Sequence, residues 1–172
     1  PPRGGVLARF AAHGRQAWRR SWFHASFWAA AVHQAAMNAS FAHVLAPGVF
    51  LFPMFTASFA LELASALRRF RAWTRNRRLP NVSADPYITV LDEIGGDNFF
   101  DGHFLRRYVE PVAKRLLRGD DAHLGVLDGG YAFARYYSAQ RDAKEQNDGV
   151  HHDSSDLTLN VALSRSGGFA GG

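Results

Sequence analysis

The segment His151-His-Asp-Ser-Ser-Asp-Leu-Thr-Leu-Asn-Val-Ala-Leu163 combines two features that indicate the fold. From Leu157 onward apolar and polar side chains alternate, which is the pattern of a half-buried β-strand. A second alternating segment, Tyr131-Ala-Phe-Ala-Arg-Tyr136, lies upstream and is separated from the first by a polar loop, residues 138–150. The last third of the chain is therefore predicted to be β-structure.

Helical periodicity dominates the chain before residue 120. Thr56 or Ser58 can cap a helix whose apolar residues fall on one stripe, namely Phe59, Leu63, Leu67 and Phe70. A further helix is expected over 98–118, kinked at Pro111 and ended by Gly119. Short strands are expected at 49–52 and 87–91. Helices first and strands afterwards predict an α+β fold, with a helical layer backing a sheet.

The start of the chain is unusual in its charge. No acid occurs before Glu62, and the net charge is +10 over residues 1–80 but −5 over residues 81–172. Two apolar stripes along 6–45 predict a helix covered on more than one side, by this domain, a partner chain or lipid. This composition is typical of an organellar transit segment, of a membrane-surface helix, or simply of an arginine-biased helix. We expect a basic, acid-free helical arm over 1–47 and a second unit over 48–172.

Composition also excludes several classes of site. With no cysteine, the chain has no disulfide, thiolate zinc site, iron–sulfur cluster or cysteine nucleophile, so a metal ion must bind His, Asp or Glu. Polar residues interrupt the uncharged stretch after Arg20, which argues against a transmembrane span. Six arginines between residues 68 and 78 could bind phosphate, but no nucleic-acid-binding module accompanies them, which favours a solvated helix end.

His151 and Asp153 are the residues most indicative of chemistry. A His-x-Asp pair entering a strand points its first and third side chains to the same face, so that imidazole and carboxylate can bind one metal ion. His152 points away. Two ligands are not a complete site, and a facial triad needs a second histidine, which the segment 154–172 does not supply.

These segments, with Glu145-Gln146 in the loop and Gly167-Gly-Phe-Ala-Gly-Gly172, resemble the iron(II)/2-oxoglutarate-dependent dioxygenases. The resemblance is greatest to the prolyl/lysyl hydroxylase branch that includes the procollagen lysyl hydroxylases. Upstream, the segments 50–53, 59–73, 90–95 and 108–117 resemble the helical layer of such proteins. The resemblance covers about residues 48–172. It implies the N-terminal portion of a double-stranded β-helix, or jelly roll, backed by helices.

The resemblance also assigns roles to individual residues. It implies that His151 and Asp153 bind Fe(II), that Tyr136 reaches the distal carboxylate of 2-oxoglutarate, and that Asn160 lines the same pocket. Thr158 shares the face of Asn160 and is expected to be a packing residue. The implied reaction hydroxylates a peptidyl Pro or Lys C–H bond while 2-oxoglutarate becomes succinate, with ascorbate keeping the iron reduced.

Other interpretations of the sequence remain open. In the family, the distal histidine and the basic residue that pairs with 2-oxoglutarate follow the position of Gly172, so this chain alone is expected to be inactive. An inactive, dioxygenase-like structural subunit is the alternative, with a protein partner covering the 6–45 arm. A phosphohydrolase using the His152-Asp153 doublet is disfavoured, because such doublets lie on helices. We expect an organelle or the secretory pathway rather than the cytosol.

Overall fold

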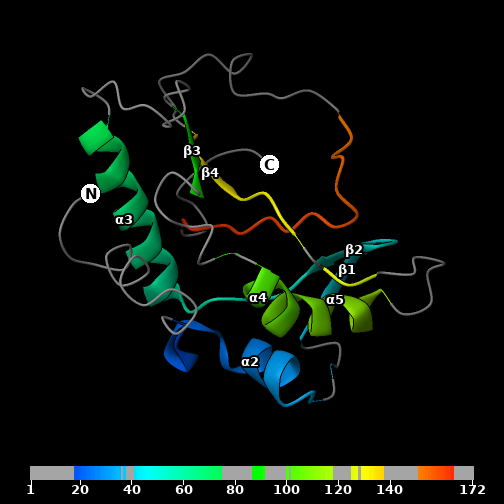
Figure 1. Ribbon diagram of the computed structural model, residues 1–172. Helices are drawn as coiled ribbons and strands as arrows, with labels where there is room; N and C mark the ends of the chain where they lie inside the picture. Colours follow the sequence, from blue (N-terminus) through cyan, green and yellow to red (C-terminus); the bar gives the residue numbers. More distant parts are fainter. Residues whose placement is uncertain are drawn as a thin grey trace.

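The computed structural model describes residues 18–35, 37, 41–74, 87–91, 100, 102–117, 125–127, 129–137 and 151–164. Helices gather on one side of two small antiparallel sheets (Figure 1). The elements, in chain order, are η2 (Arg20–Trp22), α2 (Ala25–Val32), β1 (His43–Ala46), β2 (Val49–Leu51), α3 (Ala57–Thr74), β3 (Ile88–Val90), α4 (Gly102–Phe104), the π-helical turn η5 (Leu105–Val109), α5 (Glu110–Leu116) and β4 (Phe133–Arg135).

Helix α3 confirms the helix predicted after Thr56. The Thr56 hydroxyl accepts a hydrogen bond from the Phe59 N–H at 3.4 Å, which satisfies one of the unpaired donors of the first turn. All four residues of the predicted stripe, Phe59, Leu63, Leu67 and Phe70, are buried. Because the stripe faces inward along the whole helix, α3 forms one wall of the core.

The predicted helix over 98–118 is present as α4, η5 and α5, which continue one another. Pro111 has no N–H, and its ring crowds the carbonyl four residues earlier. Directly before it, the Glu110 N–H donates to the Leu105 carbonyl, five residues back, so the helix widens into a π-helical turn. The structure thus has a π-helical turn directly before Pro111, while the kink itself stays a prediction and Gly119 lies outside the described residues.

The continuous helix predicted over 6–45 is wrong within the described residues. Helix α2 covers only Ala25–Val32, and His43–Ala46 forms strand β1. After α2, Gln34 adopts a left-handed conformation with φ of 51°, and the Ala35 N–H donates to the Ala29 carbonyl at 3.0 Å. This arrangement ends a helix without glycine or proline. In the part of the chain that the structure describes, no helix combines the length and apolarity needed to cross a bilayer.

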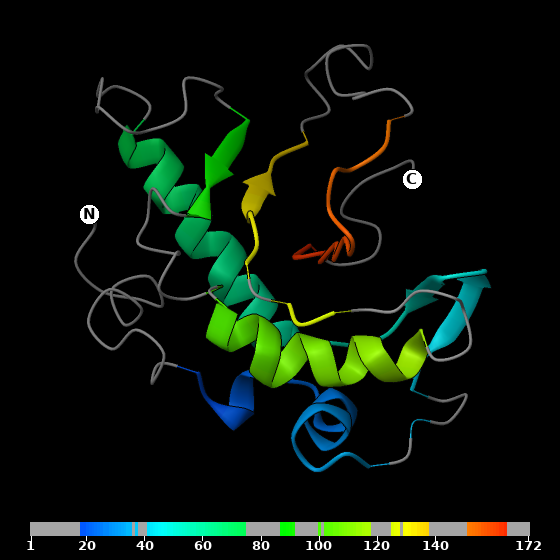
Figure 2. The same ribbon diagram turned by 45° about the vertical axis from the view of Figure 1, so that its right-hand side comes forward.

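Aromatic residues from this first segment lie in the domain core. Trp18 stacks on Phe104 with ring centroids 4.4 Å apart, and Trp22 stacks on Phe59 at 4.7 Å. The helix 102–116 lies between α2 on one side and the β3–β4 sheet on the other (Figure 2). Of the three covers considered for the apolar stripes, the domain itself buries Trp22, Phe23, Phe27, Ala30 and Phe41, whereas Val44 is 69% exposed. The boundary between residues 47 and 48 stays a prediction.

The two sheets confirm three predicted strands. Strands β1 and β2 form a hairpin whose turn contains Gly48 at φ of +72°, a conformation that glycine adopts without a Cβ clash. Strands β3 and β4 pair antiparallel, with Thr89 opposite Ala134. The strand segments predicted at 49–52, 87–91 and 131–136 each contain one of these strands.

The segment 157–163 differs from its prediction, because no β-strand is formed there. Leu157 and Leu163 pack against the core, whereas Leu159 and Val161 are 37% and 38% exposed. Alternation specifies which side chains share a face, but a strand also needs a neighbour for its N–H and C=O groups. The double-stranded β-helix accordingly stays a prediction.

Candidate functional site

The structure brings the two predicted metal ligands together. His151 Nε2 lies 3.3 Å from Asp153 Oδ1, and the two side chains are 56% and 47% exposed. The i, i+2 spacing places them on the same side of the chain although no strand is formed there. An imidazole nitrogen and a carboxylate oxygen this close can contact one ion, and these donor types suit Fe(II).

Thr158 has a role that the sequence did not reveal. It is exposed, so its predicted packing role is wrong, and its hydroxyl donates to Asp153 Oδ2 at 2.5 Å. The Ser155 hydroxyl lies 3.2 Å from the same Thr158 oxygen. Asp153 Oδ2 accepts the hydrogen bond from Thr158, and the other carboxylate oxygen, Oδ1, is the one that faces His151. Hydrogen bonds of this kind orient a carboxylate ligand.

Among the residues that the structure describes, no third ligand lies near this pair. Within the described ranges, no group of three or more His, Asp or Glu residues is arranged to hold a metal ion. His152 is exposed, and Glu145-Gln146 and Gly167–Gly172 lie outside the described residues. The assignment of His151 and Asp153 as iron ligands stays a prediction, supported by their proximity.

Tyr136 lies against the helical layer rather than in solvent. Its hydroxyl is buried and has no hydrogen-bond partner in the described structure, although the Thr89 hydroxyl is nearby. Burial raises the pKa of Tyr136 above 10.0, while Thr89 and the positive charges of Arg71 and Arg68 oppose this rise. A buried hydroxyl without a partner costs free energy, and a bound acceptor would remove that cost. A carboxylate group fits this requirement.

Asn160 does not share the environment of Tyr136. It was expected to face inward, but its side chain is exposed. The reason is that residues 157–163 do not pair with a sheet, so there is no inner face for Thr158 and Asn160 to share. The inward orientation expected for Asn160 is corrected on this point.

Comparison with known proteins identifies the family. The profile of the OGFOD2-like domain matches residues 16–119, which is more than half of the chain. The chain belongs to the OGFOD2-like domain family. The match begins inside the segment predicted as an arm and ends before Tyr136.

Several curated relatives agree with this assignment. The chain is 31% identical over 129 residues to the 2-oxoglutarate and iron-dependent oxygenase domain-containing protein CP2 of Arabidopsis thaliana, covering 73% of the chain and 31% of that protein. It is 32% identical over 124 residues to the 2-oxoglutarate and iron-dependent oxygenase domain-containing protein 2 of Homo sapiens, covering 72% and 33%.

A procollagen enzyme matches as well. The chain is 26% identical over 133 residues to the procollagen-lysine,2-oxoglutarate 5-dioxygenase 2 of Mus musculus, covering 73% of the chain and 17% of the enzyme. The resemblance to the lysyl hydroxylase-like dioxygenases is thus confirmed. The chain spans a third or less of the length of these three relatives.

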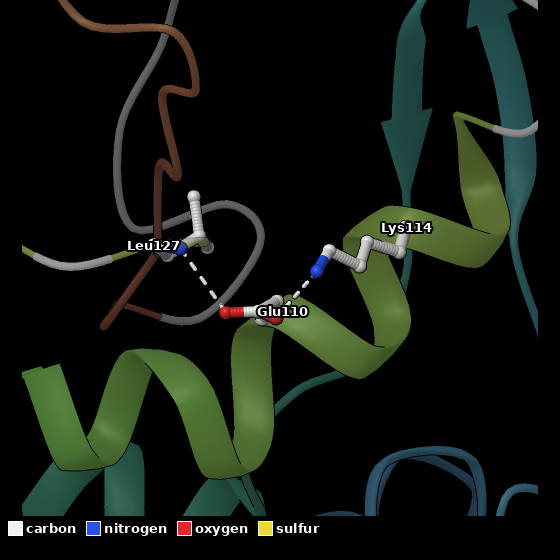
Figure 3. Close-up of polar contacts among 3 residues, drawn as sticks. All are labelled: Glu110, Lys114 and Leu127. Carbon is white, nitrogen blue, oxygen red and sulfur yellow. Dashed lines mark hydrogen bonds and ion pairs between the residues drawn. The ribbon is translucent and has the colours of Figure 1, made fainter. Parts of the chain in front are cut away.

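The Glu110 side chain links helix α5 to the segment that leads into β4. The Glu110 carboxylate binds Lys114 Nζ at 2.6 Å through one oxygen and accepts the Leu127 N–H at 3.1 Å through the other (Figure 3). The hydrogen bond to Lys114, followed in size by the opposing effect of burial, leaves the pKa of Glu110 below 4.5. The i, i+4 spacing predicts the Lys114 pair, but no sequence signal predicts Leu127.

At Gly130 the same segment passes close to the Leu105 side chain. A Cβ at position 130 would lie 2.9 Å from the Leu105 side chain, so the chain passes tightly over the π-helical turn at this point. Together, the hydrogen bond from Leu127 to Glu110 and the close contact at Gly130 fix the segment that leads into β4. They therefore also fix the position of Tyr136, just after the strand.

Proposed function

We propose that this chain is part of an Fe(II)- and 2-oxoglutarate-dependent dioxygenase that hydroxylates a C–H bond of a peptidyl Lys or Pro residue. The observation that carries this proposal is the proximity of His151 Nε2 and Asp153 Oδ1, at 3.3 Å, in a chain of the OGFOD2-like domain family. One imidazole and one carboxylate are two of the three ligands of a facial iron site.

The chain's own residues have distinct parts in this function. When bound, iron and 2-oxoglutarate supply the oxidising chemistry, in which succinate formation is coupled to oxygen insertion into a C–H bond. His151 and Asp153 contribute a neutral nitrogen and a single negative charge, so the site keeps the positive charge that a dianionic co-substrate needs. Thr158 orients Asp153, to which it donates at 2.5 Å. The buried Tyr136 hydroxyl, which has no well-formed hydrogen bond among the described residues, would donate to a carboxylate.

The substrate class rests on the relatives. Procollagen-lysine 5-dioxygenases of Mus musculus and Homo sapiens are among them, and we carry a peptidyl lysine over to this chain on that basis. Ascorbate as the reductant, and an organellar or secretory location, stay predictions from the sequence.

Iron binding tests the proposal directly. Fe(II) binding is measured by anaerobic calorimetry on the wild-type chain and on His151→Ala and Asp153→Ala, and succinate release from 2-oxoglutarate is followed in the same samples. His152→Ala is the matched control, because it removes an adjacent exposed imidazole that is not one of the two proposed ligands. We expect binding to be lost in the first two variants and retained in the control.

Two other results would contradict the proposal. Binding that is lost in His152→Ala, or that persists in both ligand variants, would assign the metal to other residues. A folded wild-type chain that neither binds Fe(II) nor releases succinate would favour the alternative of an inactive, dioxygenase-like structural subunit.

A further inference from the structure

Arg71 of α3 lies between two tyrosine rings at the end of the β3–β4 sheet. Its guanidinium carbon is 4.4 Å from the ring centroid of Tyr136 and 5.0 Å from that of Tyr87. The two tyrosines are adjacent because the Tyr136 N–H donates to the Tyr87 carbonyl at 2.9 Å. A cation over an aromatic face is attracted by the ring's quadrupole. Here the Arg71 guanidinium lies near the faces of both tyrosine rings.

This contact fixes a ring whose hydroxyl has no partner of its own. Among the described residues the Tyr136 hydroxyl is buried without a well-formed hydrogen bond, although the nearby Thr89 hydroxyl lowers its pKa. Thr89, opposite Ala134 in the sheet, is buried beside it. The Arg71 guanidinium lies over the face of the Tyr136 ring, so it is one of the contacts that hold the ring in place.

We propose that Arg71 is a positioning residue for Tyr136: its guanidinium fixes the ring so that the buried hydroxyl is aimed at the distal carboxylate of 2-oxoglutarate. This inference rests on the proposed function, in which Tyr136 binds that carboxylate. Arg71 acts through the Tyr136 ring and does not contact the iron or the reacting carbon.

Arginine and lysine are not equivalent at this position. A guanidinium group is planar and can stack on two ring faces at once, whereas an ammonium group is a compact charge that does not hold a ring plane. Arg71→Lys therefore keeps the charge near Tyr136 and loses the stacking. Arg71→Gln loses both.

A spectroscopic probe on Tyr136 separates these effects. The whole chain is labelled with ¹³Cζ-tyrosine, the Tyr136 signal is assigned with Tyr136→Phe, and the signal is followed against pH and against added 2-oxoglutarate, with Zn(II) as a diamagnetic substitute for Fe(II). Arg69→Gln is the matched control, because Arg69 is exposed on the same helix and donates a hydrogen bond to Ser65 at 2.8 Å. Thermal melts of each variant establish that the fold is intact.

We expect Arg71→Gln to move the Tyr136 signal, raise its titration midpoint and weaken 2-oxoglutarate binding about tenfold, the scale of one cation–π contact. Arg71→Lys should leave the titration midpoint close to that of the wild type, yet move the signal and weaken binding. Arg69→Gln should change none of these.

Two failures have different meanings. If the wild-type signal does not respond to 2-oxoglutarate, or if Tyr136→Phe binds it as tightly as the wild type, the proposed role of Tyr136 is wrong and the inference falls with it. If the wild type responds but folded Arg71→Gln and Arg71→Lys leave the Tyr136 signal and the affinity unchanged, only the positioning role is refuted.

Discussion

Arg115 connects two parts of the chain that the sequence predicted to be separate. Its Nη1 donates to the Ala30 carbonyl at 2.8 Å, and its Nη2 donates to the Ala35 carbonyl. The Ala30 carbonyl belongs to the last turn of α2, where carbonyl groups lack helical partners and carry partial negative charge. Replacing Arg115 with methionine removes both bonds and keeps most of the apolar length of the side chain.

The magnitude follows from these two contacts. A hydrogen bond from a charged donor contributes about 1.5–3 kcal/mol. Because Arg115 is only half-buried and water can replace part of each bond, the lower value applies, which gives a loss of about 3 kcal/mol in the free energy of unfolding. In a domain of this size, such a loss lowers Tm by about 6–12 °C. It is a large part of the stability of a typical domain.

Urea unfolding measured by tryptophan fluorescence reports this loss, because Trp18, Trp22 and Trp28 lie in or beside the core. Arg106→Met is the matched control: Arg106 is exposed on the same continuous helix, and its replacement should change the free energy of unfolding by less than about 0.5 kcal/mol. Equal midpoints for Arg115→Met and Arg106→Met would refute the reasoning, and α2 would then be held by its apolar contacts alone.

Two further substitutions test local features. Glu110→Gln should lower the free energy of unfolding by about 1 kcal/mol at pH 7. The pKa of Glu110 in the folded protein is below its usual 4.5. The stability difference between wild type and variant should therefore persist above pH 4.5 and disappear as the pH falls through the folded pKa. Urea midpoints at pH 7 and pH 3 check this, and a constant difference would contradict it. Gly48→Ala should cost about 1 kcal/mol because φ is +72° with open space around the Cβ position, and Gly48→Asn should cost less; equal melting temperatures for both variants and the wild type would contradict this.

Features with a local cause could be predicted from the sequence. Thr56 and the stripe on α3 lie within one helix, so periodicity and a cap residue define that element. The proximity of His151 and Asp153 follows from a spacing of two residues. The end of α2 could not be predicted, because Gln34 is neither glycine nor proline and adopts its left-handed conformation in the folded context.

Contacts between distant residues were beyond the reach of the sequence patterns. Arg71 and Tyr136 are brought together by the packing of α3 against the β3–β4 sheet, and Glu110 reaches Leu127 across a loop. An arginine near the end of a helix is ordinarily a solvated residue, and nothing in its local sequence indicates two aromatic partners. A search of the sequence for His, Asp and Glu as metal ligands also misses residues such as Thr158, which orients a ligand by a hydrogen bond.

The side chains around β4 differ in burial between the two faces of the strand. Ala132, Ala134 and Tyr136 pack against the helical layer, while Tyr131, Phe133 and Tyr137 on the alternate positions are exposed, two of them by more than 60%. A strand that carries large apolar side chains on both faces is typical of a sheet that is covered on both sides. The helices cover one face here. A second sheet layer over the other face, as in a double-stranded β-helix, is the arrangement that would bury these three aromatic residues.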